Sequence, residues 1–380
     1  MIYLDNSATT RPLPAAADAV NRCLTETYFN PSSAYSPAVA VERSVEEARS
    51  RFAQALGASP AEIVYSSGGT ESNNMAIMGT LSARRGRGAL ITSVVEHPSV
   101  YEVFRYLEHG GYETSYIGVD ATGAVQLAAL EDALSEKTSL VSIMHINNET
   151  GAINDIEGAY SLIRRRAPQA ALHVDGVQAF CKVPFGKPSC DFYSVSGHKF
   201  HGPKGIGALY VKNGTPFSGG QIGGGQERGL RSGTTNVPGI LGMDAALTAY
   251  RTMQKQWIPQ MRACKLRLAA NLQSIPDVIL NGPQPDKGAP HILNASFLGV
   301  RGEVLLHALE QKGIYVSTGS ACSAHKKGKN RILAAMGIEG ARQEGALRFS
   351  LSPLNTQEEM DVAAQAIAEL TVYLRRFKRR

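Results

Sequence analysis

Short apolar runs alternate with stretches of helical periodicity between about residues 61 and 211. Candidate strands lie at 62–65, 89–93, 139–143, 171–174, 192–195 and 206–211. The intervening stretches at 73–81, 99–109 and 156–165 have the three-to-four-residue spacing of apolar positions that favours helices. Strands separated by helices predict an α/β fold with a mostly parallel sheet wrapped by helices.

A second, smaller α/β unit is predicted toward the C-terminus. A helical pattern around 241–270 leads into it, and we expect Pro259 to kink or interrupt that helix. Strands are expected near 292–297 and 314–317, with helices near 304–312 and 357–375. We therefore predict a large domain over residues 14–250 and a small domain built from 1–13 and 251–380.

Composition narrows the class of protein. With 380 residues, 43% of them hydrophobic, the chain is too long for one compact domain. No apolar run approaches the roughly 18 residues of a membrane span, and the first six residues lack the basic start and apolar core of a signal peptide. We expect a cytoplasmic protein. Its net charge of +6 could help an acidic partner or a tRNA approach, but solubility explains it equally well, and direct nucleic-acid binding is not expected.

Polar residues gather where the predicted strands end. In parallel sheets, ligands bind beyond the carboxyl ends of the strands. The stretch 67–74 follows a strand and opens a helix, so its glycines and Thr70 could present N–H and O–H donors to a phosphate. It could equally be an ordinary strand-to-helix turn capped by Thr70.

Three further strand ends carry residues with cofactor chemistry. Asp175 is either a helix cap or the partner of a pyridinium nitrogen, with Gln178 one turn away. Lys199 stands in a turn where Ser196 and His198 could admit a phosphate, the setting of a Schiff-base lysine. Lys204 competes for that role but follows Pro203, away from the strand end. A lone histidine such as His97 is usually structural, although an imidazole at this edge could shuttle protons.

Two residues of the smaller unit add to this set. Cys322 lies in a loop of small residues without bulky apolar neighbours, which is typical of an accessible thiol, and the basic residues after it favour the thiolate. The loop could also carry an incidental cysteine. Arg348 lies within an apolar strand and therefore needs an anionic partner such as a substrate carboxylate. All five cysteines lack metal-like spacing, so we expect free thiols in a reducing compartment.

Taken together, these stretches resemble the cysteine desulfurases of the NifS/IscS type, which belong to the class V aminotransferases and have the aspartate-aminotransferase-like fold (fold type I). The similarity runs nearly end to end. It is carried by the segments 3–10, 30–33, 69–74, 96–100, 145–151, 175–178, 196–207, 223–234, 318–322 and 348–350.

The resemblance implies a pyridoxal 5'-phosphate enzyme that removes sulfur from L-cysteine and leaves L-alanine. Lys199 would bind the cofactor covalently, Asp175 would pair with its pyridine nitrogen, Gln178 would contact its phenolic oxygen, and His97 would stack on its ring. The phosphate would be held by Gly69, Thr70, Ser196 and His198. Asn148 would lie at the cofactor and, with Arg348, receive the substrate carboxylate.

The same resemblance implies partners. Thr234 would reach the phosphate of a neighbouring subunit in a homodimer, and Cys322 would carry a persulfide to an iron–sulfur scaffold or a tRNA-thiolation protein. The chain departs from the family in having Tyr35 and Ala38 where relatives usually carry His and Gly. Its stretch 325–330 is also unusually basic, which leaves open the acceptor that docks there. The alternatives are a selenocysteine lyase or aminotransferase of the same fold, or a non-catalytic sulfur-carrying scaffold.

Overall fold

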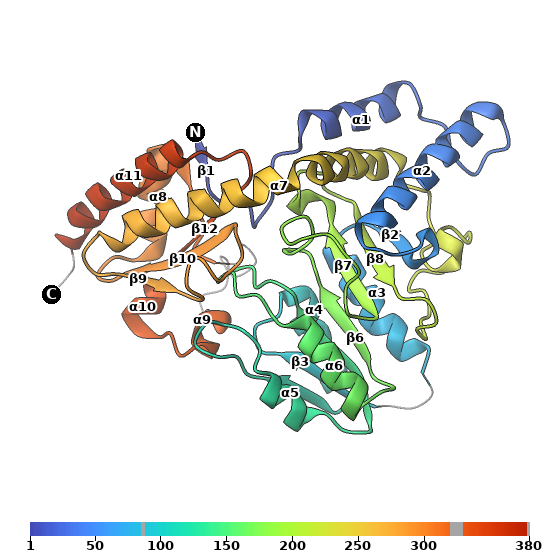
Figure 1. Cartoon of the computed structure of the whole chain (residues 1–380), viewed down its shortest axis with the longest axis horizontal. Helices are drawn as coiled ribbons and strands as arrows, with labels where there is room; N and C mark the ends of the chain where they lie inside the picture. The colour runs from blue at the N-terminus through green and yellow to red at the C-terminus, as the bar shows by residue number, and fades with distance from the viewer. Residues whose placement is uncertain (85–87, 320–329, 378–380) are drawn as a thin grey trace.

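The large unit is built around a seven-stranded sheet, seen in a computed structural model that describes residues 1–84, 88–319 and 330–377 (Figure 1). The strand order is β2-β8-β7-β6-β5-β3-β4, and only β8 runs antiparallel to its neighbours. The mostly parallel sheet that we predicted is therefore confirmed. Its strands are β2 (Ile63–Ser66), β3 (Ala89–Ser93), β4 (Thr114–Ile117), β5 (Thr138–Met144), β6 (Ala171–Asp175), β7 (Phe192–Ser196) and β8 (Gly207–Val211).

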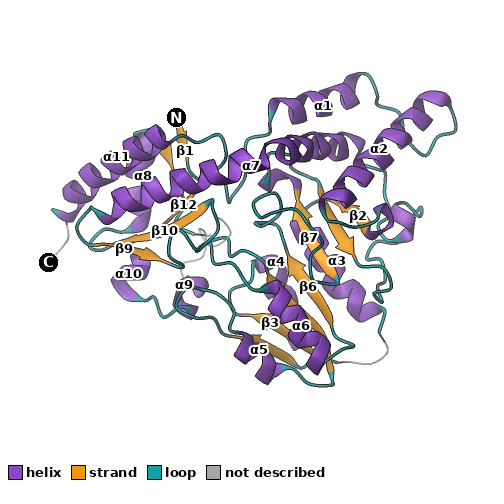
Figure 2. Cartoon of the chain, in the orientation of Figure 1, coloured by secondary structure: helices purple, strands orange, loops and turns teal. Residues whose placement is uncertain are grey.

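Helices cover both faces of this sheet (Figure 2). Neighbouring strand residues point to opposite faces, so Leu140 joins the core that contains α3 and α4 residues while Val141 joins the core that contains α2 and α6 residues. Burial on both faces explains why apolar residues stand on both faces of the central strands. The helices of this unit are α1 (Pro14–Thr25), α2 (Ser36–Ala55), α3 (Gly69–Ser82), α4 (Pro98–His109), α5 (Leu127–Ala133) and α6 (Ile156–Arg166), with 3-10 turns η1 (Pro60–Glu62), η2 (Gly197–Lys199) and η3 (Glu227–Gly229).

One long helix, α7 (Val237–Gln273), links the two units (Figure 1). Its first half packs against α1 and α2, and its second half packs against α11. The interruption expected at Pro259 does not occur, because the helix is continuous through it. A proline at 259 has no N–H, so the carbonyl of Lys255 loses its usual helical partner. Both residues are exposed, and water can therefore satisfy that carbonyl. Buried residues on either side of the proline hold the helix in place.

The smaller unit has a core of its own. Its antiparallel sheet has the order β12-β10-β9, and β1 pairs in parallel with β11. Leu4 packs in this core beside residues of the second half of α7 and of α11, whereas the large core spans Leu13 to Tyr250. The two units thus have separate cores, and the domain bounds expected from the sequence stay a prediction. The elements are β1 (Ile2–Tyr3), β9 (Val278–Asn281), β10 (Ile292–Phe297), β11 (Ile314–Tyr315), β12 (Ala346–Ser350), α8 (Gly302–Gln311), α9 (Arg331–Ala335), α10 (Gly340–Glu344) and α11 (Gln357–Arg375).

Two further observations concern the described residues. None of their helices combines the length and apolar character that crossing a bilayer requires. Four of the five cysteines are described, and each is a buried free thiol: Cys23, Cys181, Cys190 and Cys264.

Candidate active site

A cavity of about 220 Å³ opens at the carboxyl ends of the central strands, between the two units. It is lined by all the predicted site residues of the described chain except Thr234. These are Gly69, Thr70, His97, Asn148, Asp175, Gln178, Ser196, His198, Lys199 and Arg348. The topology thus brings together residues that lie up to 279 positions apart in the sequence (348 − 69).

One wall of the cavity, at the start of α3, is shaped to bind an anion. We call its residues, Gly69, Thr70, Ser196 and His198, the anion cradle. Gly68 has φ +149°, which favours glycine, and a Cβ added to Gly69 would lie 2.6 Å from Cγ2 of Val177. The same added atom would lie 3.6 Å from Cβ of Ser196. Backbone N–H groups at a helix N-terminus, beside a hydroxyl and with no side chain in the way, suit a phosphate.

A hydrogen-bonded network joins the base of the cavity to its side. Nδ2 of Asn73 donates to Oδ2 of Asp175 and to Oγ of Ser99, both at 2.8 Å. Oγ of Ser99 lies 2.8 Å from Nδ1 of His97. The second oxygen of Asp175 accepts the N–H of Val177 at 3.0 Å. Asp175 is therefore held as an acceptor on both oxygens, and the His97 ring is oriented through the network.

Electrostatics favour a neutral imidazole at His97. Burial lowers its pKa below the ordinary value, which outweighs the opposing effect of Asp175, and Lys199 and Arg331 lower it further. Burial likewise lowers the pKa of His198 to about 4, with Lys199 contributing. A neutral imidazole can both accept a proton and donate one, as a proton shuttle requires.

The N-terminal segment forms the roof above Lys199. Nζ of Lys199 donates to the carbonyls of Ser7, at 2.5 Å, and Ala8, at 2.9 Å. Nε2 of Gln178 donates to the same Ser7 carbonyl at 3.0 Å. Oε1 of Gln178 is buried and has no hydrogen-bond partner among the described residues. Sequence reasoning missed Ser7 and Ala8, because their backbone carbonyls rather than their side chains take part.

Arg348 supplies the opposite wall. It is 1% exposed; one Nη donates to Oδ1 of Asp5 at 2.7 Å and the other to the carbonyl of Asn148 at 3.1 Å. Within the described chain, its Nε and the Oδ1 of Asn148 are buried without a partner. A buried guanidinium N–H that still requires an acceptor fits a carboxylate ligand.

Thr234 lies away from this cavity in a surface segment between β8 and α7, and it is exposed. Two ion pairs tie the segment to the large unit, with Arg231 and Glu71 at 2.8 Å and Arg49 and Glu227 at 2.7 Å. Because Glu71 belongs to α3, the segment is anchored at the anion cradle. The contact of Thr234 with a neighbouring subunit stays a prediction.

Cys322 lies outside the described residues, but the structure describes the residues on either side of 320–329. Nδ2 of Asn330 donates to Oε2 of Glu149 at 2.6 Å. A Cβ added to Gly319 would lie 3.1 Å from the same oxygen. The two ends of the cysteine-bearing segment therefore meet at Glu149, which directly follows Asn148 in the cavity wall.

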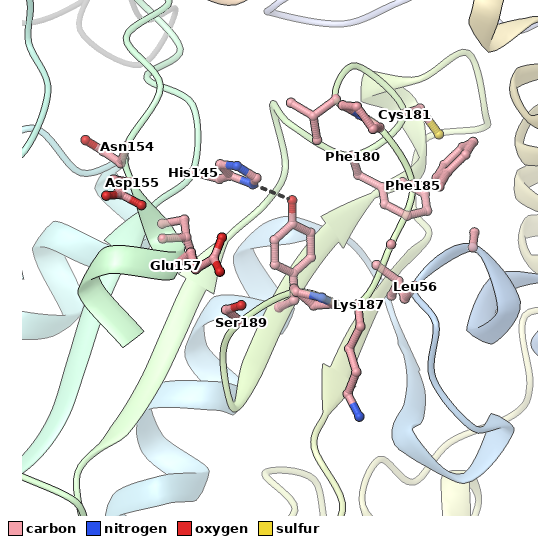
Figure 3. A pocket seen from close by; sticks show the side chains of 17 residues that line it. Leu56, His145, Asn154, Asp155, Glu157, Phe180, Cys181, Phe185, Lys187 and Ser189 are labelled. Atoms are coloured by element: carbon pink, nitrogen blue, oxygen red, sulfur yellow. Dashed lines mark hydrogen bonds between the residues drawn. The ribbon is translucent and has the colours of Figure 1, made fainter. Parts of the chain in front are cut away.

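A second cavity, of about 330 Å³, lies beside the loop at 183–189 (Figure 3). Nδ1 of its His145 lies 2.9 Å from the hydroxyl of Tyr193, and burial lowers the pKa of His145 to about 4. Its lining includes none of the predicted site residues, and its phenylalanines pack into the large core. The smaller cavity is therefore the better candidate for the active site.

Comparison with known proteins agrees with this geometry. The family model for class V aminotransferases matches residues 2–362. A cysteine desulfurase of Trichormus azollae is 39% identical over 378 residues, which cover 99% of this chain and 94% of that protein. A solved NifS-like protein superimposes with a TM-score of 0.92 at 36% identity, covering 98% of this chain and 99% of that one. The structure described as SspA in complex with cysteine has a TM-score of 0.81 at 30% identity, covering 93% and 99%.

The chain belongs to the class V aminotransferase family and has its fold type I architecture. Within that family its similarity is to the cysteine desulfurases of the NifS/IscS type, so the resemblance and the fold class predicted from the sequence are confirmed.

Proposed function

We propose that this protein is a pyridoxal-phosphate-dependent cysteine desulfurase. The observation that carries the proposal is one cavity in which Lys199, Asp175 and Arg348 face a common space with the anion cradle of α3. An amine, a carboxylate, a phosphate site and a carboxylate-binding arginine are the groups that a pyridoxal-phosphate enzyme acting on an amino acid needs.

The cavity residues fit the cofactor. Lys199 would hold it covalently, Asp175 would pair with its ring nitrogen, and Gln178, through its buried amide, would lie at the phenolic oxygen. The cradle residues Gly69, Thr70, Ser196 and His198 would hold its phosphate. When bound, the cofactor supplies an electron sink that stabilises negative charge on the substrate α-carbon.

The remaining residues act on L-cysteine. Arg348 and Asn148 would orient its carboxylate. Lys199 Nζ would take the α-proton, and the neutral ring of His97 can exchange protons with the substrate near neutral pH. The Cys322 thiolate would attack the substrate sulfur, so that a new S–S bond forms as the substrate Cβ–S bond breaks. The balanced result is L-alanine and a Cys322 persulfide.

We further propose that the enzyme is a cytoplasmic homodimer in which Thr234 completes the phosphate site of the partner. The buried free thiols are consistent with a reducing compartment. The sulfur would pass to an acceptor such as an iron–sulfur scaffold or a tRNA-thiolation protein.

The test compares alanine and sulfide production from L-cysteine, with a thiol reductant present, for the wild type, Lys199→Ala and Cys322→Ala. We expect both products from the wild type only, a loss of the visible absorbance of the cofactor in Lys199→Ala, and retained absorbance in Cys322→Ala. Normal turnover by Cys322→Ala would refute the persulfide role. An aminotransferase would instead need no Cys322 and would consume an added keto acid.

A further inference from the structure

A second lysine lies directly behind Lys199. Lys182 follows β6 in the turn at 176–182, and only 3% of it is exposed. Its Nζ donates to the backbone carbonyl of Lys199 at 2.7 Å. Lysine is almost never fully buried without a partner, and the hydrogen bond to Lys199 gives this ammonium a specific task.

Burial is the main influence on the pKa of this ammonium. Burial, followed by the positive charge of Lys199, lowers the pKa of Lys182 to about 7, although the neighbouring thiol of Cys181 acts in the opposite direction. Lys182 in turn contributes to the lowered pKa values of three histidines, each of which is lowered mainly by burial. These are His198, His201 and His291.

We infer that Lys182 is a positioning residue for Lys199: it holds the carbonyl of the η2 turn and sets a like charge close to the reactive amine. The hydrogen bond restrains the backbone from which the Lys199 side chain projects into the cavity. A neighbouring cation disfavours a second ammonium and so increases the fraction of Lys199 present as the neutral amine. The neutral amine is the form that condenses with an aldehyde. The inference rests on the proposed cofactor role of Lys199.

The test measures how fast the cofactor-stripped full-length chain binds added pyridoxal phosphate between pH 6 and pH 9. Binding is followed by visible absorbance and by trapping of the covalent adduct with borohydride. In Lys182→Met, we expect binding at pH 6 to be about threefold slower than in the wild type, because the like charge that Lys182 carries at that pH is gone. At pH 7 the difference should be smaller, since about half of Lys182 in the wild type is neutral there. The difference should vanish toward pH 9, where Lys182 of the wild type is itself neutral.

Lys204→Met is the matched control, because Lys204 is an exposed lysine in the glycine-rich segment that also contains Lys199. It should bind the cofactor at the wild-type rate at both ends of the pH range. If Lys182→Met does not fold, Lys182→Gln removes the charge while keeping an N–H donor, and the same slower binding at pH 6 is expected. A wild-type rate at pH 6 in a folded Lys182 variant, or an equally slow rate in Lys204→Met, would overturn the inference. Covalent binding by Lys199→Ala would instead refute the proposed role of Lys199.

Discussion

Replacing Asn73 by alanine tests whether the network beneath the cavity works as a unit. Asn73 is 1% exposed, and both of its Nδ2 hydrogens are used, one on Asp175 and one on Ser99. The hydrogen bond to the carboxylate contributes about 1.5–3 kcal/mol and the bond to the hydroxyl about 0.5–1.5 kcal/mol. Because both partners are buried, truncation leaves one oxygen of Asp175 without its donor and Ser99 Oγ with only its contact to His97. We therefore expect Asn73→Ala to lower the free energy of unfolding by about 2–4 kcal/mol.

The effect should reach the reaction as well as the fold. Without Asn73, one oxygen of Asp175 loses its donor and Ser99 loses the contact that orients it toward His97. We expect kcat to fall by about tenfold or more, with KM for L-cysteine changing little, since Arg348 lies on the other wall. Unfolding is measured by urea denaturation of the cofactor-loaded protein, and turnover by alanine release.

Asn74→Ala is the control on the same helix. Nδ2 of Asn74 donates to the carbonyl of Thr70 in its own helix, at 2.9 Å and in an exposed position. Its loss should change stability by no more than about 0.5 kcal/mol. If Asn73→Ala behaved like Asn74→Ala in both assays, the network would not position Asp175 or His97, and this account of the site would be wrong.

Two further predictions concern packing and pH. Gly69→Ala should weaken binding of pyridoxal phosphate by about tenfold or more, because the new Cβ would lie 2.6 Å from Cγ2 of Val177. Adding Val177→Ala should restore much of the affinity. Equal affinities for the single and double variants would contradict the steric cause. Burial raises the pKa of Glu96 from 4.5 to about 8, so wild-type stability should fall as pH rises through that window. Glu96→Gln cannot lose stability in this way. From pH 5 to pH 8, its free energy of unfolding by urea should therefore rise relative to that of the wild type by more than about 1 kcal/mol. A constant difference across that range would show that Glu96 does not titrate there.

The strands with the clearest pattern were the best predicted. The ranges 89–93 and 292–297 match β3 and β10 residue for residue, because every residue of β10 and nearly every residue of β3 is buried. The edge strand β4 was missed, since three of its four residues are only half-buried and its apolar pattern is weak. Of the kink or interruption expected at Pro259, the interruption was wrong, because tertiary packing holds the helix on both sides of the proline.

The site was predictable to the extent that a parallel sheet collects its strand ends at one edge. That rule alone predicts that Asp175, Ser196 and Lys199 lie at one edge of the sheet, and all three line the cavity there, but it does not predict their roles. The bridging role of Asn73 was not predictable, because its partner Asp175 lies 102 residues away and an asparagine one turn into a helix has no distinctive local signature. Lys182 resembled an ordinary turn lysine until its burial and its contact with Lys199 were known.

The N-terminal segment at residues 5–8 contacts the active-site residues of both units. Asp5 accepts a hydrogen bond from Arg348 of the small unit, and two residues later the carbonyl of Ser7 accepts from Lys199 of the large unit. The backbone N–H of Ser7 also donates to Oγ of Ser350 at 2.8 Å, next to Arg348 on β12. The arginine expected to hold the substrate carboxylate and the lysine expected to hold the cofactor are thus joined by a few extended residues that contact both. Since each group belongs to a different unit, this short segment sets the spacing between them together with the direct hydrogen bond from Arg348 to the carbonyl of Asn148.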